Sequence, residues 1–76
     1  MAKLPALTGM QVVRVFQKAG FSVARISGSH HIMKKEGHLR RLSIPVHAGK
    51  TVGQGLLKSQ ISEAGLTIEQ FLSLLD

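Results

Sequence analysis

The sequence contains no cysteine, no tryptophan and no tyrosine, and only four of its 76 residues are acidic. Without cysteine the chain can form neither a disulfide framework, nor a thiolate nucleophile, nor a cysteine-containing zinc site. No apolar run reaches the roughly 18 residues of a membrane span, and the N-terminus lacks the apolar region of a signal peptide. We therefore expect a cytoplasmic protein whose residues 1–76 form one small domain with a thin core.

Aromatic residues are scarce as well. Phe16, Phe21 and Phe71 are the only ones, and each occupies a position that favours burial in the core. Many modules bind single-stranded nucleic acid by stacking bases on exposed aromatic rings. The sequence does not favour this mode of binding.

Positive charge, in contrast, is abundant. Ten Lys and Arg residues give a net charge of +6, and nine of the ten lie between Arg14 and Lys58 with Glu36 as the one acid among them. A solvated surface is one explanation, but so one-sided a balance favours a polyanionic partner. Nucleic acid and an acidic protein surface both qualify.

Capping motifs indicate where the helices begin. The Thr8–Gln11 and Thr67–Gln70 pairs have the spacing of a capping box and predict a helix over about 9–19 and a short terminal helix. Between them, a periodic stretch predicts a second long helix that ends at Gly65. Its periodic positions are Leu56, Leu57, Gln60, Ile61 and Ala64. The terminal helix carries Ile68, Phe71, Leu72 and Leu75, which we expect to complete the core.

Three strands are predicted between the two long helices. The first begins at Phe21, and regular alternation would place Phe21, Val23 and Arg25 on one face of it. A tight turn at Gly28–Ser29 leads into a strand over 30–35, and a second turn at 36–38 leads into a strand over 40–45. Residues 46–52 form a loop before the second helix.

The element order is therefore helix, three-stranded antiparallel sheet, helix and short helix. Two helices on one face of such a sheet form a layered α+β domain with the other face open. Double-stranded-RNA-binding domains have the same order and recognise RNA by its shape, through phosphate and 2′-hydroxyl contacts. Fold alone does not establish function, which depends on the residues of a site.

The segment Gly28-Ser29-His30-His31 is the strongest candidate site. Glycine permits a left-handed turn and a close approach of a ligand, and the Ser29 hydroxyl with nearby N–H groups can hold a phosphate oxygen. An imidazole populates both protonation states near neutral pH and can transfer protons at a phosphodiester. Because His30 and His31 are adjacent on a strand, they point to opposite faces and only one can meet a substrate; a purely structural role for both is the alternative.

The two other histidines lie in predicted loops. His38, in the turn between strands, is expected to be a solvated loop residue. His47 could join the basic site from the loop before the second helix, or make a hydrogen bond within that loop. Adjacent histidines on a strand diverge and cannot share one metal ion, so we expect no metal and no other cofactor.

Several short motifs occur together in a recognisable order. They are Leu4-Pro5, Thr8-Gly9, Lys18-Ala19-Gly20-Phe21, Gly28-Ser29-His30-His31, Ile44-Pro45-Val46-His47, Gly49-Lys50 and Ala64-Gly65-Leu66. Over nearly its whole length the sequence resembles the HicA-type mRNA interferase toxins, also called the YcfA-like family.

This resemblance implies the toxin of a type II toxin–antitoxin pair, a small ribonuclease with a double-stranded-RNA-binding-like fold that cleaves mRNA and so blocks translation. It also implies a HicB-like antitoxin, whose partial RNase H-like domain covers the active site. The functional histidine of the family lies in the Gly-Ser-His segment, which corresponds to His30. Some members have one residue between serine and histidine, which makes His31 the second candidate.

The expected chemistry is attack of an RNA 2′-hydroxyl on the adjacent phosphate, with His30 as general acid or base and cations stabilising the transition state. We expect RNA contacts from glycine, hydroxyl, imidazole and cationic groups. These are Gly28, Ser29, Lys34, Lys35, Arg40, Arg41, His47 and Lys50. Two alternatives remain open: a noncatalytic double-stranded RNA-binding module, and a protein-interaction domain whose basic face docks an acidic partner.

Overall fold

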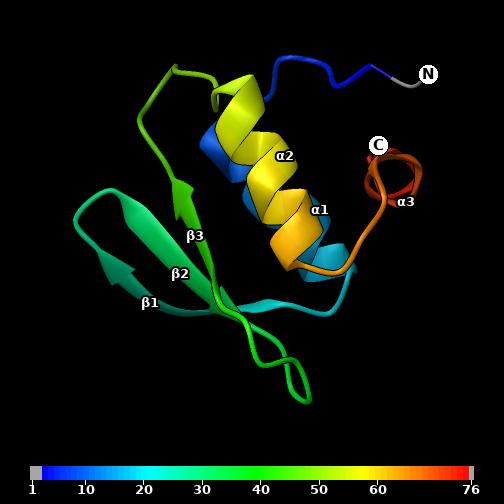
Figure 1. The fold of residues 1–76 in the computed structure, drawn as a ribbon. Helices are drawn as coiled ribbons and strands as arrows, with labels where there is room; N and C mark the ends of the chain where they lie inside the picture. The colour runs from blue at the N-terminus through cyan, green and yellow to red at the C-terminus, as the bar shows by residue number, and fades with distance from the viewer. Residues whose placement is uncertain (1–2, 76) are drawn as a thin grey trace.

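One helix precedes a three-stranded sheet and two further helices follow it (Figure 1). The structure, a computed structural model, describes residues 3–75. Its elements are α1 (Gly9–Lys18), β1 (Ser22–Ser27), β2 (His30–Lys34), β3 (Leu42–Pro45), α2 (Gln54–Glu63) and α3 (Ile68–Ser73). The order confirms the predicted α+β fold. Within the described residues, no helix has the length and apolar character needed to cross a membrane.

Both predicted capping boxes are present. The Thr8 amide donates to Gln11 Oε1 at 2.8 Å and the Gln11 amide donates to Thr8 Oγ1 at 3.3 Å. Thr67 and Gln70 make the same reciprocal pair at 2.8 and 3.0 Å. Each box satisfies amides that the first turn of a helix would otherwise leave unpaired, so α1 and α3 begin where the sequence predicts. Helix α2 begins after Gly53 without a side-chain cap.

The sheet is antiparallel in the order β1-β2-β3. Gly28 and Ser29 form a two-residue turn, with Gly28 at φ 59°, which is typical of a type II′ hairpin. Strands β2 and β3 are shorter than predicted, because β2 ends at Lys34 and β3 begins only at Leu42. The connection between them is therefore longer than predicted and spans residues 35–41.

The predicted regular alternation along β1 is wrong. Val23 pairs with Met33 and Arg25 pairs with Ile32, so Ala24 is an extra residue without a partner. Such a bulge reverses the alternation, because facing residues of antiparallel strands point to the same side. Val23 therefore points to the side of the helices and Arg25 to the open face.

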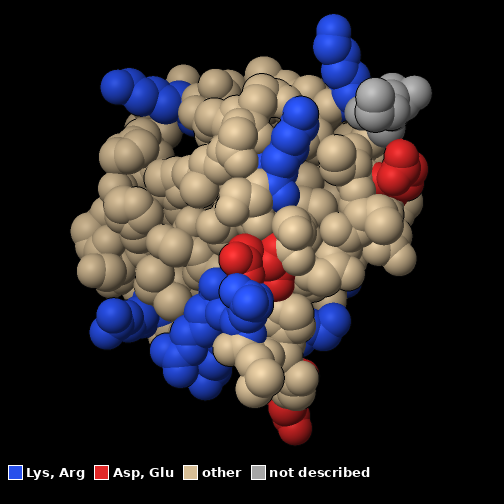
Figure 2. Space-filling view, in the orientation of Figure 1, with Lys and Arg blue, Asp and Glu red and all other residues tan. Residues whose placement is uncertain are grey.

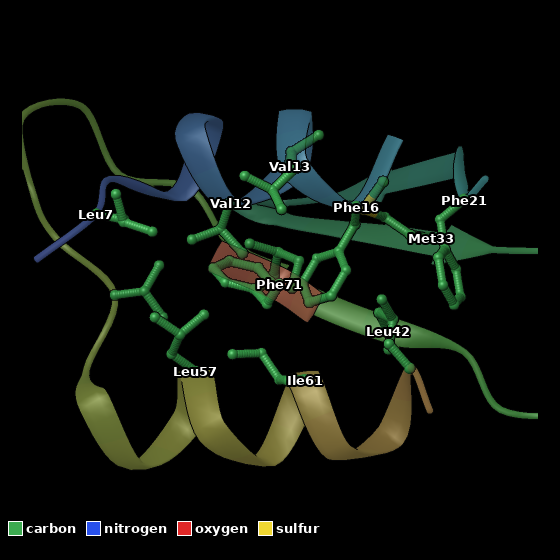
Figure 3. Close-up of a cluster of buried hydrophobic side chains, with 14 of the residues drawn as sticks. Leu7, Val12, Val13, Phe16, Phe21, Met33, Leu42, Leu57, Ile61 and Phe71 are labelled. Carbon is green, nitrogen blue, oxygen red and sulfur yellow. The ribbon is translucent and has the colours of Figure 1, made fainter. Parts of the chain in front are cut away.

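The buried core lies between the sheet and the helices (Figure 3). Phe71 of α3 lies between α1 and α2, and its ring centroid is 5.4 Å from that of Phe16. Phe21 packs on the other side of Phe16 with the ring centroids 6.0 Å apart. All three phenylalanines are buried, as predicted, and α3 completes the core. The remaining buried side chains are aliphatic or methionine, and no polar or charged residue of the described chain is buried.

Glycine at position 9 allows the start of α1 to lie directly on the end of β3. A β-carbon at this position would come within 2.3 Å of the Pro45 carbonyl oxygen and 2.8 Å of Val46 Cα. Both of these are backbone atoms, which cannot turn aside as a flexible side chain could. The contact therefore fixes where the chain leaves β3.

We expect Gly9→Ala to lower the free energy of unfolding by about 1–3 kcal/mol, because the methyl group forces two backbone segments apart. Gly55→Ala is the matched control, since nothing lies within 4 Å of its added carbon. Alanine is the better helix former by up to about 1 kcal/mol, so the control should be neutral or stabilising. Urea unfolding of both variants measures the difference, and equal stabilities would contradict the close approach.

Candidate active site

The β1–β2 turn and the segment after β3 meet at one end of the sheet. The Val46 amide donates to the Ser29 carbonyl at 2.7 Å, and His30 is paired with Pro45. His47 follows at once, and its Nε2 lies 3.4 Å from Ser29 Oγ. Backbone pairing therefore brings Ser29, His30 and His47 to the same end of the sheet, although 18 positions separate Ser29 from His47.

The two adjacent histidines point to opposite faces, as predicted. His31 is paired with Ile44, which is fully buried, so His31 points to the side of the helices. His30 is exposed on the open face. Only His30 can meet a ligand that lies on the open face.

His31 is half-buried, and its Nδ1 is shielded from solvent without a hydrogen-bond partner among the described residues. Buried polar atoms in folded proteins are rarely left unpaired, and a chemical role is one of the explanations for an exception. The structure thus gives the second candidate an environment different from that of His30.

The loop after β3 holds Lys50 close to this end in sequence and in structure. The Lys50 amide donates to the His47 carbonyl at 3.0 Å, which closes a turn. The next residues are tied to the start of the chain, because the Val52 amide donates to the Leu7 carbonyl at 2.8 Å. Lys50 is exposed and therefore available to an anion.

The other predicted phosphate ligands lie elsewhere. Lys34 is four residues from His30 along β2, about 13 Å at the usual rise of a strand. Lys35 holds its Nζ 5.6 Å from the centroid of the Phe21 ring, and Arg40 forms an ion pair with Glu63 at 2.9 Å. Arg41 is exposed just before β3, at the same end as Lys34. The candidate ligands thus form two groups at opposite ends of the sheet.

Lys and Arg side chains are unevenly spread over the surface in the view of Figure 2. Several gather on the lower part of the molecule, where the sheet lies in Figure 1, while others stand apart at the top. Acidic side chains are few in this view. The face in this view therefore has a local concentration of positive charge, at the part of the molecule where the β2–β3 turn lies in Figure 1.

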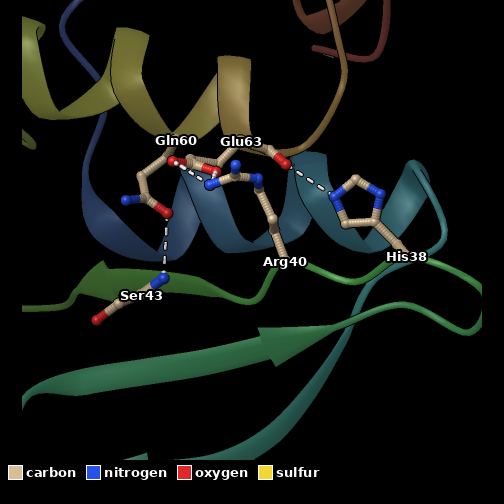
Figure 4. A network of polar contacts seen from close by, with 5 residues as sticks. All are labelled: His38, Arg40, Ser43, Gln60 and Glu63. Carbon is tan, nitrogen blue, oxygen red and sulfur yellow. Dashed lines mark hydrogen bonds and ion pairs between the residues drawn. The ribbon is translucent and has the colours of Figure 1, made fainter.

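His38 is not a solvated loop residue, which corrects the expectation from sequence. Its side chain is half-buried, and Nε2–H donates to the Glu63 carbonyl at 2.7 Å (Figure 4). Its ring also packs edge-on against Phe21, with the centroids 5.3 Å apart. Glu63 ends α2, so His38 satisfies a carbonyl that the helix cannot pair internally. Its partners are distant in sequence, which is why local pattern gave no sign of them.

A second polar contact links α2 to the sheet in the same region. Gln60 Oε1 accepts a hydrogen bond from the Ser43 amide at 3.1 Å (Figure 4). This contact satisfies a donor on the outer edge of β3, which would otherwise face solvent or another chain. Together with the Arg40–Glu63 pair, it gives this end of the sheet a structural role. Within residues 3–75, no three His, Asp or Glu side chains lie close enough together to hold a metal ion.

Comparison with known proteins agrees with the sequence motifs. Residues 9–66 match the family model described as HicA toxin of bacterial toxin–antitoxin. The matched segment runs from the first residue of α1 to just beyond α2, and so includes the whole sheet and all four histidines. A search of curated proteins found no match.

The different environments of His38 and His30 predict different effects on stability. His38→Ala removes the hydrogen bond to α2 and the contact with Phe21, so we expect a loss of about 1–3 kcal/mol in the free energy of unfolding. The exposed His30→Ala variant should stay within about 0.5 kcal/mol of the parent. Thermal and urea unfolding provide the comparison. An equal loss in both variants would contradict the assignment of His38 to a structural role.

Proposed function

Because the chain belongs to the HicA family of toxins from bacterial toxin–antitoxin systems, we propose that it is an endoribonuclease that cleaves mRNA without a metal ion and so blocks translation. In this proposal residues 1–76 are one toxin domain, and the protein acts in the cytoplasm, where mRNA is translated. The observation that carries it is the exposed His30 beside the Ser29–His47 pair.

The proposed reaction uses the RNA as its own nucleophile. The 2′-oxygen attacks the adjacent phosphorus while the bond from phosphorus to the 5′-oxygen breaks, which yields a 2′,3′-cyclic phosphate and a free 5′-hydroxyl. One group takes the proton of the 2′-hydroxyl and another gives a proton to the leaving oxygen. Imidazoles can do both near neutral pH, and no further reactant is required.

We assign one of these proton transfers to His30. Its imidazole is exposed on the open face and follows directly after the Gly28–Ser29 turn, whose hydroxyl and amides can hold a phosphate oxygen. Lys50, from the adjoining loop, can supply positive charge as the phosphate acquires more negative charge in the transition state. His31 remains the second candidate, because its Nδ1 has no partner among the described residues.

His47 is the proposed second proton-transfer group. Its Nε2 approaches the Ser29 hydroxyl, and the backbone bond from Val46 to Ser29 holds the two segments together. His47 can act as the general acid when His30 acts as the general base, or the reverse. From the sequence, His47 could join the basic site or make a hydrogen bond within its loop; its position beside Ser29 supports the first of these.

Members of a toxin–antitoxin family act with an antitoxin partner. We propose that a HicB-like antitoxin covers the end of the sheet that carries Ser29, His30 and His47. His30 and His47 are exposed at this end, and the net charge of +6 favours an acidic protein surface in place of the RNA. Covering this end would separate the histidines from the substrate.

Incubation of the chain with a long single-stranded mRNA in EDTA tests the proposed activity. We expect cleavage by the parent, a loss of about 10²- to 10⁴-fold in rate for His30→Ala, and a smaller loss for His47→Ala. Gln17→Ala changes an exposed side chain of α1 and serves as control, with full activity expected. Fragments are followed on a denaturing gel.

Two outcomes of this experiment would overturn parts of the proposal. Loss of cleavage in His31→Ala, with His30→Ala unaffected, would transfer the proton-transfer role to His31. Retention of intact RNA on the parent chain would show a noncatalytic RNA-binding module.

Hydrogen exchange measures where an antitoxin sits. On binding of a HicB-like antitoxin, amides in residues 28–30 and 46–50 should exchange more slowly, and RNA cleavage should stop. Helix α3 lies outside the proposed interface and should exchange as in the free chain. Slower exchange confined to α3 and the adjoining face of α1 would place the antitoxin elsewhere.

A further inference from the structure

The open face of the sheet carries a row of cations that starts at the proposed catalytic residue. Facing residues of antiparallel strands share a side, and Met33, Leu42 and Ile44 mark the helix side because they are buried. The opposite, open side therefore carries two cations together with His30. These are Arg25 of β1 and Lys34 of β2, and we call the three residues the basic row.

The three members of the basic row are spaced at regular intervals. Arg25 is paired with Ile32, which lies two residues after His30 on β2. Arg25 is therefore two residues from His30 along the strand direction and one strand to the side. Lys34 lies two residues further along β2. Each step is about 6–7 Å along the strand, which is comparable to the separation of successive phosphates in an extended RNA strand.

The two cations of the basic row have no side-chain partner among the described residues. Arg25 and Lys34 are exposed, and neither side chain makes a hydrogen bond or ion pair with another residue of the described chain. The three strands contain no Asp or Glu. Two other cations do have partners inside the fold: Arg40 is paired with Glu63, and Lys35 lies over Phe21. Arg25 and Lys34 are therefore available to external phosphates.

The reaction chemistry selects single-stranded RNA as the occupant. Attack by the 2′-oxygen requires this oxygen, the phosphorus and the leaving 5′-oxygen to lie nearly in line. A-form duplex geometry holds the 2′-hydroxyl out of this line, whereas a single strand can adopt it. Apart from His30, the row presents no aromatic ring for base stacking, so the contacts of Arg25 and Lys34 are to the backbone and tolerate any base.

From these observations, and resting on the proposed function, we propose that the open face binds single-stranded RNA beside the scissile phosphate. In this arrangement Arg25 and Lys34 hold successive phosphates on one side of His30. Arg25 is thus an RNA ligand that depends on the bulge at Ala24, since regular alternation would place it on the helix side with Val23.

The test uses a single-stranded RNA with 2′-O-methyl groups, which the proposed reaction cannot cleave. Binding is measured by fluorescence anisotropy over a range of salt concentrations. Log K, where K is the association constant, falls as log salt rises. Arg25→Gln and Lys34→Gln should each make this fall shallower by about 0.7, equivalent to about fourfold weaker binding at roughly 0.15 M salt. The double variant should lose about twice that slope.

Arg14→Gln is the matched control, because it removes the same charge from the outer face of α1, where Arg14 lines a hollow with Leu7 and Leu75. Its salt slope should equal that of the parent. Equal effects of Arg14→Gln and Arg25→Gln would overturn the proposal, as would tighter, Arg25-dependent binding of the same RNA annealed to its complement. This binding is measured without cleavage. A parent chain that binds the RNA through Arg25 and Lys34 but cleaves no RNA would contradict the proposed function and leave the RNA-binding proposal standing.

Discussion

The close packing of α1 on the end of β3 governs the geometry at the candidate site. Gly9 has no side chain, so the first turn of α1 rests on the backbone of Pro45 and Val46. Val46 in turn donates its amide to Ser29, which places the loop carrying His47 against the β1–β2 turn. Two segments distant in sequence therefore meet with their polar groups exposed, on a support formed by backbone atoms and a buried apolar core.

Charge is divided between roles within this small fold. Arg40 and Lys35 contribute to the structure through Glu63 and Phe21, at the end of the sheet opposite His30. Arg25, Lys34 and Lys50 remain exposed without such contacts. Net charge alone indicates a polyanionic partner. The contacts that each cation makes within the fold distinguish the cations that stabilise the structure from those that are free to bind RNA.

Local signals account for the parts of the fold that were predictable from sequence. The two capping boxes involve residues only three positions apart, and the turn at Gly28–Ser29 needs only a glycine at the right place. The opposite orientations of His30 and His31 follow from the geometry of a strand alone. The HicA family could also be recognised from its motifs, most of which lie within residues 9–66, the segment that matches the family model.

Long-range contacts explain what sequence reasoning missed. The bulge at Ala24 depends on the pairing with β2 and reverses the face of Arg25. His38 finds its partner 25 positions away, at the end of α2, so its burial has no local signature. The approach of His47 to Ser29 likewise depends on how β3 pairs with β2. Neighbouring cations with the same appearance in the sequence, such as Lys34 and Lys35, acquire different roles for the same reason.

One substitution in the substrate tests the proposed chemistry most directly. An RNA oligonucleotide with a single mapped cleavage site is compared with the same oligonucleotide carrying 2′-deoxyribose on the 5′ side of that site, and the ends of the products are identified by mass spectrometry. Attack by the 2′-oxygen predicts a 2′,3′-cyclic phosphate and a 5′-hydroxyl from the first oligonucleotide, and no cleavage of the second at that position. A 5′-phosphate end, or cleavage of the deoxy-substituted bond, would contradict it.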